Sequence, residues 1–149
     1  MKARFPLIFR VVNSFLICVV ILLLGSPSAL ASSSLTGLAS LRKMAHDSVT
    51  FDLALSQKQP SVIEFYANWC SACQSMAPIM EQLHQEYAQQ INFVMLNVDE
   101  PQWQAAIDKY RVIAIPHLVL LSENHQAMET LVGIVPKVAL ERSLTNLIE

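Results

Sequence analysis

Two cysteines separated by two residues constrain this chain more than any other feature of its sequence. Cys70 and Cys73 follow the largely apolar run 61–66 and open a helical pattern over 71–89, so the pair stands at a strand-to-helix junction. The first sulfur then lies at a helix N-terminus, where unpaired N–H groups and the helix dipole stabilise a thiolate. Zinc sites use the same spacing, but the sequence offers no second Cys pair. The junction therefore predicts a redox-active dithiol, with a zinc or copper site as the alternative.

Strand and helix patterns alternate through the chain beyond residue 46. Residues 48–57 predict a first helix, and the nearly continuous apolar run 62–67 predicts a central strand that is buried on both faces. Residues 91–98 predict a second buried strand, and the helix between the two strands makes them parallel. The remaining predicted elements are a short helix from residue 101, strands at 118–121 and 128–132, and an amphipathic helix at 137–148.

Several runs of this sequence belong together: Val62-Ile63-Glu64-Phe65-Tyr66-Ala67-Asn68-Trp69-Cys70, Ser71-Ala72-Cys73, Ala77-Pro78, Phe93-Val94-Met95-Leu96-Asn97-Val98-Asp99, Ile115-Pro116-His117 and Val132-Gly133. In this order they resemble the thioredoxin superfamily over about two thirds of the chain. Glu64 in place of the usual Asp and the Ile-Pro-His triplet are most similar to the membrane-anchored, lumen-facing thioredoxin-like proteins of cyanobacteria and chloroplast thylakoids. The resemblance implies an α/β thioredoxin fold, with a central mixed sheet of about four strands flanked by helices.

The two cysteines are expected to have different roles in disulfide exchange. Cys70 as a thiolate attacks a substrate disulfide, and Cys73, one turn further along the helix, resolves the mixed disulfide. A permanent disulfide of a small exported domain is the alternative for this pair. A crosslink that closes only two residues gains little loop entropy, however, so the spacing favours a redox role.

Glu64 is an acid in a strand otherwise made of Val, Ile, Phe and Tyr. If its side chain points inward, burial raises its pKa, which suits it to take the proton from Cys73 during resolution. The resemblance implies this role, because the matching position in thioredoxins is an acid behind the active site. The alternation of side chains along a strand leaves open that Glu64 points to solvent.

The resemblance also implies four residues for binding the substrate. Pro116 is expected to follow a cis peptide bond and to face the dithiol, so that the backbone of Ile115 pairs with the substrate chain. Trp69 is expected beside the dithiol as part of the docking surface. Gly133 is expected near the same groove, where a missing side chain lets substrate backbone approach, although a turn glycine at a strand end is the alternative.

No metal or cofactor is expected beyond the Cys70–Cys73 disulfide itself. His117 is expected at the surface without a required role. Its position beside Pro116 leaves open that it tunes the Cys70 pKa or completes a copper site with the two cysteines.

Residues 1–31 have the pattern of an export segment. A basic start is followed by the apolar run 11–24, and Ala29-Leu30-Ala31 forms a small-x-small cleavage pattern. The run suits a cleaved signal peptide, whereas its extension back to Pro6 suits a membrane anchor. In both cases the dithiol faces away from the cytoplasm. We therefore divide the chain into a signal peptide or membrane anchor (1–31), a Ser-rich tether with weak helical character (32–45) and a thioredoxin-like domain (46–149).

The charge of the chain argues against a nucleic-acid partner. Ten Lys and Arg stand against twelve Asp and Glu, and three of the basic residues lie within the first ten positions. Beyond residue 31, seven basic residues face twelve acidic ones, so no basic surface is predicted.

The expected function is thiol–disulfide oxidoreduction, most simply the reduction of disulfides in exported or lumenal proteins. The resemblance implies apocytochrome substrates, a part in cytochrome b6f assembly and redox homeostasis, and electrons from a membrane thiol-reductant carrier. It implies a location in the thylakoid lumen or on the periplasmic side of a membrane. The Gly-Pro of thioredoxins is replaced by Ser71-Ala72 here, so the reduction potential does not carry over. Two alternatives stay open: a disulfide oxidase or isomerase, and a chaperone module that binds metal or client without turnover.

Overall fold

The computed structural model describes residues 29–149, with side chains from residue 36 onward. Residues 33–149 form one compact unit. The predicted export or anchor segment lies outside the described residues except for its last three positions. None of the helices in the described part is long and apolar enough to cross a membrane.

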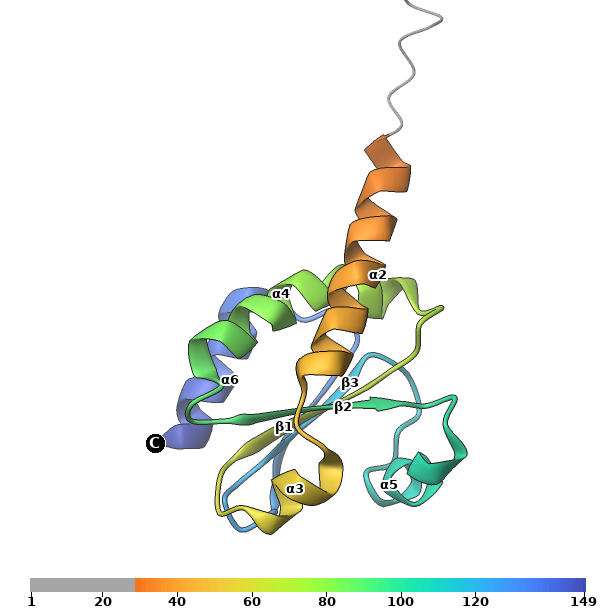
Figure 1. Ribbon diagram of the computed structural model, residues 1–149. Helices are drawn as coiled ribbons and strands as arrows, with labels where there is room; N and C mark the ends of the chain where they lie inside the picture. The colour runs from red at the N-terminus through yellow and green to blue at the C-terminus, as the bar shows by residue number, and fades with distance from the viewer. Residues whose placement is uncertain (1–28) are drawn as a thin grey trace, which may run out of the picture. The chain divides into compact units, whose positions relative to one another are not determined.

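A mixed sheet of four strands forms the centre of this unit (Figure 1). The strands are β1 (Ser61–Tyr66), β2 (Asn92–Asn97), β3 (His117–Leu121) and β4 (Ala127–Val132), in the spatial order β2-β1-β3-β4. β1 pairs with β2 in parallel and with β3 antiparallel, and β4 closes the sheet antiparallel to β3. All six residues of β1 are buried, because helices cover both faces of the sheet. The predicted thioredoxin fold with about four strands is thus confirmed.

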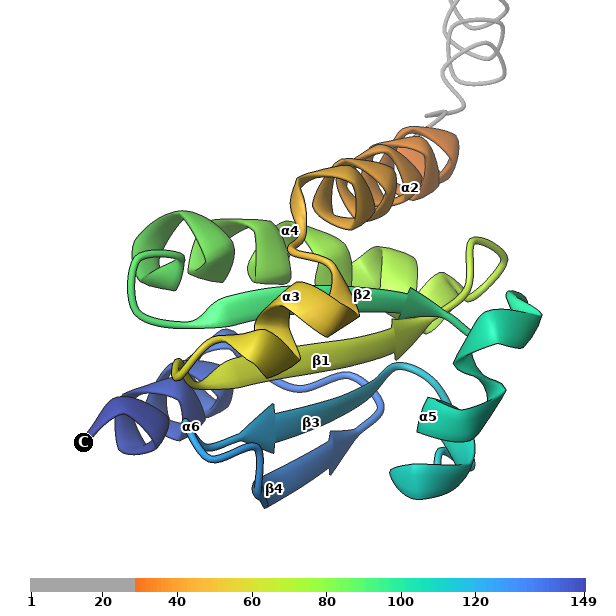
Figure 2. The same ribbon diagram turned by 60° about the horizontal axis from the view of Figure 1, so that its bottom comes forward.

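Helices pack on both faces of the sheet (Figure 2). α4 (Ser71–Tyr87) and α6 (Lys137–Ile148) share one core with the first face, through Met76, Met80, Leu83, Leu140 and Leu144. α3 (Phe51–Ser56), the 3-10 turn η1 (Pro101–Trp103) and α5 (Gln104–Lys109) cover the other face. Alternate residues of each strand therefore face two different cores, and this assigns each strand residue to one side of the sheet.

Residues 32–45 differ from the tether that we expected there. They belong to α2 (Ala29–Asp47), a 19-residue helix. Leu41 and Met44 lie one helical turn apart, and both are fully buried in cores that α4 also enters. The serines of this stretch lower its intrinsic helix propensity only slightly, and tertiary packing overrides such a preference. The division of the chain at residues 31 and 45 stays a prediction.

Candidate active site

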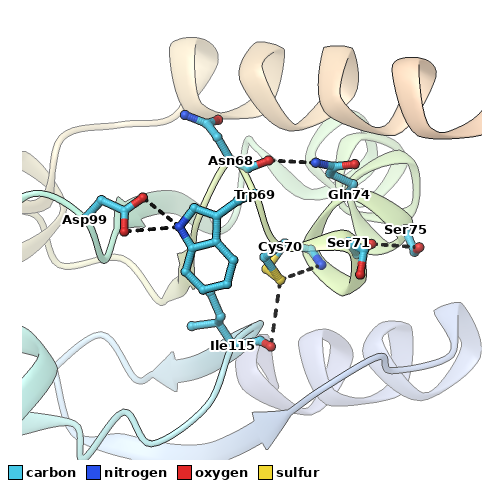
Figure 3. Close-up of a disulfide and its surroundings, with 9 residues drawn as sticks. Asn68, Trp69, Cys70, Ser71, Gln74, Ser75, Asp99 and Ile115 are labelled. Carbon is cyan, nitrogen blue, oxygen red and sulfur yellow. Dashed lines mark hydrogen bonds between the residues drawn. A yellow bond between two sulfur atoms is a disulfide. The ribbon is translucent and has the colours of Figure 1, made fainter.

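The dithiol lies where β1 passes into α4. Cys70 is the N-cap residue of α4 and is joined to Cys73 by a disulfide (Figure 3). Its Sγ accepts the backbone N–H of Cys73 at 3.0 Å. A helix N-terminus has N–H groups without intrahelical partners, and here one of them points at the first sulfur. In the reduced protein the same N–H would stabilise a Cys70 thiolate.

A short turn fixes the direction in which the chain enters α4. The N–H of Cys70 donates to the carbonyl of Ala67 at 3.1 Å, and the N–H of Gln74 donates to the carbonyl of Cys70 at 3.0 Å. The side chain of Gln74 then reaches back from the helix and donates to the Asn68 carbonyl at 2.6 Å (Figure 3). Asn68 and Trp69 are exposed, whereas the two cysteines are buried. The turn therefore holds the sulfurs just beneath an exposed loop.

A second loop faces the disulfide from β3. The Ile115–Pro116 peptide bond is cis, as the resemblance implied. The carbonyl oxygen of Ile115 lies 3.9 Å from Sγ of Cys70. The N–H of Gly133 donates to the Pro116 carbonyl at 2.8 Å, which ties the end of β4 to this loop. Gly133 has φ of +84°, so its backbone conformation favours glycine, and a Cβ there would meet open space.

Trp69 is the most exposed aromatic side chain at the site, with 69% of its surface accessible. Its indole N–H donates to both carboxylate oxygens of Asp99, at 3.2 and 3.0 Å (Figure 3). The carboxylate holds the ring in place although the ring is not buried. Sequence reasoning assigned no role to Asp99. The signal was present, however, because an indole N–H beside an active site needs an acceptor and the predicted strand 91–98 ends next to Asp99.

Glu64 lies in the middle of β1 and is only 1% exposed. Val62 and Tyr66, its alternate neighbours along the strand, pack in cores with α4, and the Tyr66 core contains both cysteines. Glu64 therefore projects from the face of the sheet that α4 covers. Neither of its carboxylate oxygens has a hydrogen-bond partner, and burial raises its pKa from an ordinary 4.5 to about 8.

His117 is buried, and the expectation that it lies at the surface is wrong. Its side chain is 2% exposed, and its ring packs edge-on against Phe65 at 5.9 Å between centroids. Phe65 belongs to the core beneath α3 and α5, on the face of the sheet away from the two cysteines. The backbone alternates here, so the side chain after Pro116 points away from the dithiol. Among the described residues, no three His, Cys, Asp or Glu side chains come together in a way that could hold a metal ion.

We predict that His117→Leu makes the protein less sensitive to mild acid. Burial lowers the pKa of His117 below its ordinary 6.5, so the unfolded chain takes up this proton before the folded protein does. Stability is therefore lost as the pH falls below about 6.5. Thermal unfolding at about pH 7 and pH 5 should show a smaller drop in Tm for His117→Leu than for the wild type. His46→Gln, at an exposed position, is the control; equal drops in all three proteins would contradict the prediction.

A disulfide between an N-cap cysteine and a cysteine one turn later, beside a cis-proline loop in a fold built on a mixed sheet, defines the thioredoxin-fold thiol–disulfide oxidoreductases. The thioredoxin family model matches residues 42–146 of this chain. The chain therefore belongs to the thioredoxin family.

Two known proteins are similar to this chain over most of its length. The "Thiol:disulfide interchange protein TxlA homolog" of Synechocystis sp. is 35% identical over 137 residues, which are 92% of this chain and 76% of that protein. The "Thioredoxin-like protein HCF164, chloroplastic" of Oryza sativa subsp. japonica is 39% identical over 101 residues, or 68% of this chain but only 38% of that protein. These two relatives come from a cyanobacterium and a chloroplast, the two sources that the sequence resemblance named.

A solved structure shows the same fold. Mitochondrial thioredoxin 3 of Saccharomyces cerevisiae, in its oxidized form, superimposes with a TM-score of 0.59 at 27% sequence identity. The match covers 70% of this chain and 99% of the yeast protein. The chain is thus a thioredoxin-like thiol–disulfide oxidoreductase whose redox group is the Cys70–Cys73 disulfide.

Proposed function

We propose that this protein reduces disulfide bonds in other proteins, with Cys70 as the nucleophile and Cys73 as the resolving thiol. The observation that carries the proposal is the N–H of Cys73, which donates to Sγ of Cys70 at 3.0 Å at the start of α4. This hydrogen bond favours ionisation of Cys70 over Cys73 in the reduced pair. Cys70 is also the more accessible of the two, at 6% against 0%.

The reaction proceeds by two exchanges of sulfur. The Cys70 thiolate attacks one sulfur of the substrate disulfide; a Cys70–substrate bond forms, the substrate bond breaks and a substrate thiolate leaves. Cys73 then loses its proton and attacks Sγ of Cys70. The Cys70–Cys73 disulfide forms, and the second substrate thiolate leaves. Two electrons have passed to the substrate, so a dithiol donor must reduce the pair before the next turnover.

Glu64 is proposed to accept the proton of Cys73 in the second exchange. Three observations support this role: the carboxyl projects from the sheet face that α4 covers, both of its oxygens lack a partner, and its pKa is about 8. A base with a pKa close to that of a thiol can take up and return a proton with little loss of free energy. The same carboxyl would return the proton to Cys73 when a donor reduces the disulfide.

The substrate chain is proposed to bind over the exposed surface around Cys70. Trp69 supplies an apolar face that Asp99 holds in place, and Ile115 offers its backbone beside the sulfur. Pro116 shapes that loop, and Gly133 leaves open space at its side. An extended peptide that lies across this surface would bring its own sulfur to Cys70.

Reduction is favoured over oxidation by the residues between the two cysteines. Strong oxidants of this type stabilise their reduced form through the thiolate. Here the two residues between the cysteines, Ser71 and Ala72, carry no charge. No charged side chain between the cysteines therefore adds to the stabilisation of a Cys70 thiolate, which a strong oxidant would need.

The relatives support a finer proposal for location and clients. We propose that residues 1–31 export the domain or anchor it, so that the dithiol works in the thylakoid lumen or on the periplasmic side of a membrane. Apocytochromes, whose haem-attachment cysteines must be reduced, are the proposed clients, and a membrane thiol-reductant carrier is the proposed donor. The support is the similarity to a cyanobacterial thiol:disulfide interchange protein and to a chloroplast thioredoxin-like protein.

The equilibrium reduction potential of the Cys70–Cys73 pair tests the direction of electron flow. We expect a value near that of thioredoxin, roughly −270 mV, in glutathione and dithiothreitol buffers, together with reduction of insulin. A value near roughly −120 mV would show that the protein donates disulfides, and the oxidase alternative would replace the reductase. No reversible couple at all would favour a binding module without turnover.

A further inference from the structure

Helix α2 makes an unusually close contact with the first turn of α4. A Cβ atom added at Gly37 would lie 2.5 Å from the backbone oxygen of Gln74 and 3.0 Å from its carbonyl carbon. Gln74 directly follows the resolving cysteine. A separation of 2.5 Å is far inside van der Waals contact, so only a residue without a side chain lets the two helices approach this closely. The atom in the way is backbone, which cannot turn aside as the end of a side chain would.

Leu41, one turn beyond Gly37, extends the contact from the backbone of α4 to the dithiol itself. It is fully buried and belongs to one apolar cluster with Tyr66, Cys70 and Cys73. The ion pair between Lys43 and Glu81, 3.1 Å apart, links α2 and α4 further along. α2 is therefore fixed against α4 at three successive points, and the first two lie at the cysteines.

Gln74 connects this helix contact to the Cys70 sulfur through its hydrogen bonds. Its backbone N–H donates to the carbonyl of Cys70, and its side chain donates to the carbonyl of Asn68 at 2.6 Å. Gln74, whose carbonyl faces Gly37, therefore donates hydrogen bonds to the two residues that flank Trp69. A shift of this residue would move the helix turn that directs the Cys73 N–H at Sγ of Cys70.

We propose that Gly37 and Leu41 of α2 are positioning residues for the dithiol, because they hold the first turn of α4 at the distance that keeps the Cys73 N–H on the Cys70 sulfur. The inference rests on thiol–disulfide exchange at Cys70 and Cys73, and it holds whether the protein reduces or oxidises its substrates. A side chain at residue 37 would push this turn away and weaken the hydrogen bond to the thiolate. The reduced form would then be less stabilised, the Cys70 thiolate would become rarer at a given pH, and the equilibrium would shift toward the disulfide.

Gly37→Val in the full chain, with detergent present, tests this role against Ala39→Val on the exposed side of the same helix. The rate of Cys70 alkylation by iodoacetamide at about pH 6 reports the thiolate fraction. We expect this rate to fall about fivefold to tenfold for Gly37→Val, as for a weakened hydrogen bond to a charged group. The glutathione equilibrium constant should shift toward the disulfide by a similar factor, whereas Ala39→Val should match the wild type in both measurements.

Leu41→Ala is the second variant, and it decides the question if Gly37→Val does not fold. It leaves the helix surface intact but removes the side chain that contacts the cysteine cluster, so we expect the same two changes in the same direction. Folded variants whose alkylation rate and equilibrium constant equal those of Ala39→Val would overturn the proposal. A wild-type protein without a reversible couple would instead contradict the oxidoreductase assignment itself, so the two failures are distinguishable.

Discussion

Cys70→Ser is expected to abolish the reduction of insulin disulfides, whereas Cys73→Ser is expected to trap the protein on its substrate. Without Cys70 no sulfur at the N-cap of α4 receives the Cys73 N–H, so no mixed disulfide forms there. Without Cys73 the first exchange still takes place, but no thiol resolves the product. Each variant should lose activity by about a thousandfold or more, as is usual when a nucleophile is removed.

The trapped species distinguishes the roles of the two sulfurs. Reduced Cys73→Ser, mixed with oxidised insulin, should give a covalent complex on non-reducing gels that dithiothreitol releases, and Cys70→Ser should give none. Cys18→Ser is the matched control for a thiol elsewhere in the chain, and it should turn over insulin like the wild type. A complex formed by Cys70→Ser but not by Cys73→Ser would reverse the assignment of nucleophile and resolving thiol.

The sequence was sufficient to predict the sheet and the helices that cover it. β1 is buried on both faces. A strand of this kind can be recognised in the sequence as a nearly continuous apolar run, because none of its residues has to face solvent. The short elements were predicted less accurately. α3 begins at Phe51, three residues later than expected, because the Thr50 side chain accepts the Leu53 N–H and caps the helix there.

Features that depend on distant contacts were not predicted. The spacing of Leu41 and Met44 fits a helix, but it does not show whether that segment is packed or exposed. Both side chains are buried because α4 lies against them. His117 directly precedes the predicted strand 118–121, and its polar ring suggested a place at the surface; its burial depends on Phe65, 52 positions earlier in the chain. Trp69 and Asp99 each follow one of the two predicted parallel strands, but they are 30 positions apart and the sequence alone did not pair them.

Glu64→Gln is expected to stabilise the folded protein at alkaline pH and to leave it unchanged at acidic pH. In the folded protein the pKa of Glu64 is about 8, against an ordinary 4.5, so the unfolded chain loses this proton first. The stability contributed by the protonated carboxyl is complete below about pH 4.5 and is lost as the pH rises to about 8. A neutral Gln has no such loss. The free energy of unfolding should therefore favour the variant at pH 9 by a few kcal/mol, on the order of 4.

Urea unfolding of the oxidised protein between pH 4 and pH 9 measures this difference. The two curves of stability against pH should coincide near pH 4 and separate steadily up to about pH 8. Glu123→Gln, in an exposed turn, is the control for the loss of a carboxylate and should follow the wild type throughout. Parallel curves for Glu64→Gln and the wild type would show that Glu64 is not a buried, neutral carboxyl.

The same substitution should slow the chemistry that the carboxyl is proposed to assist. Gln cannot accept the Cys73 proton, so the resolution of a preformed Cys70 mixed disulfide should be roughly a hundredfold slower, the usual contribution of a general base. In the wild type the resolution rate should rise with pH and level off near pH 8, where Glu64 becomes ionised, and the variant should lack this step. A variant that is more stable yet resolves as fast as the wild type would show that Cys73 gives its proton directly to water. Stability gained at pH 9 together with a lost resolution step would instead mean that this buried acid is kept for proton transfer, at the expense of the fold around it.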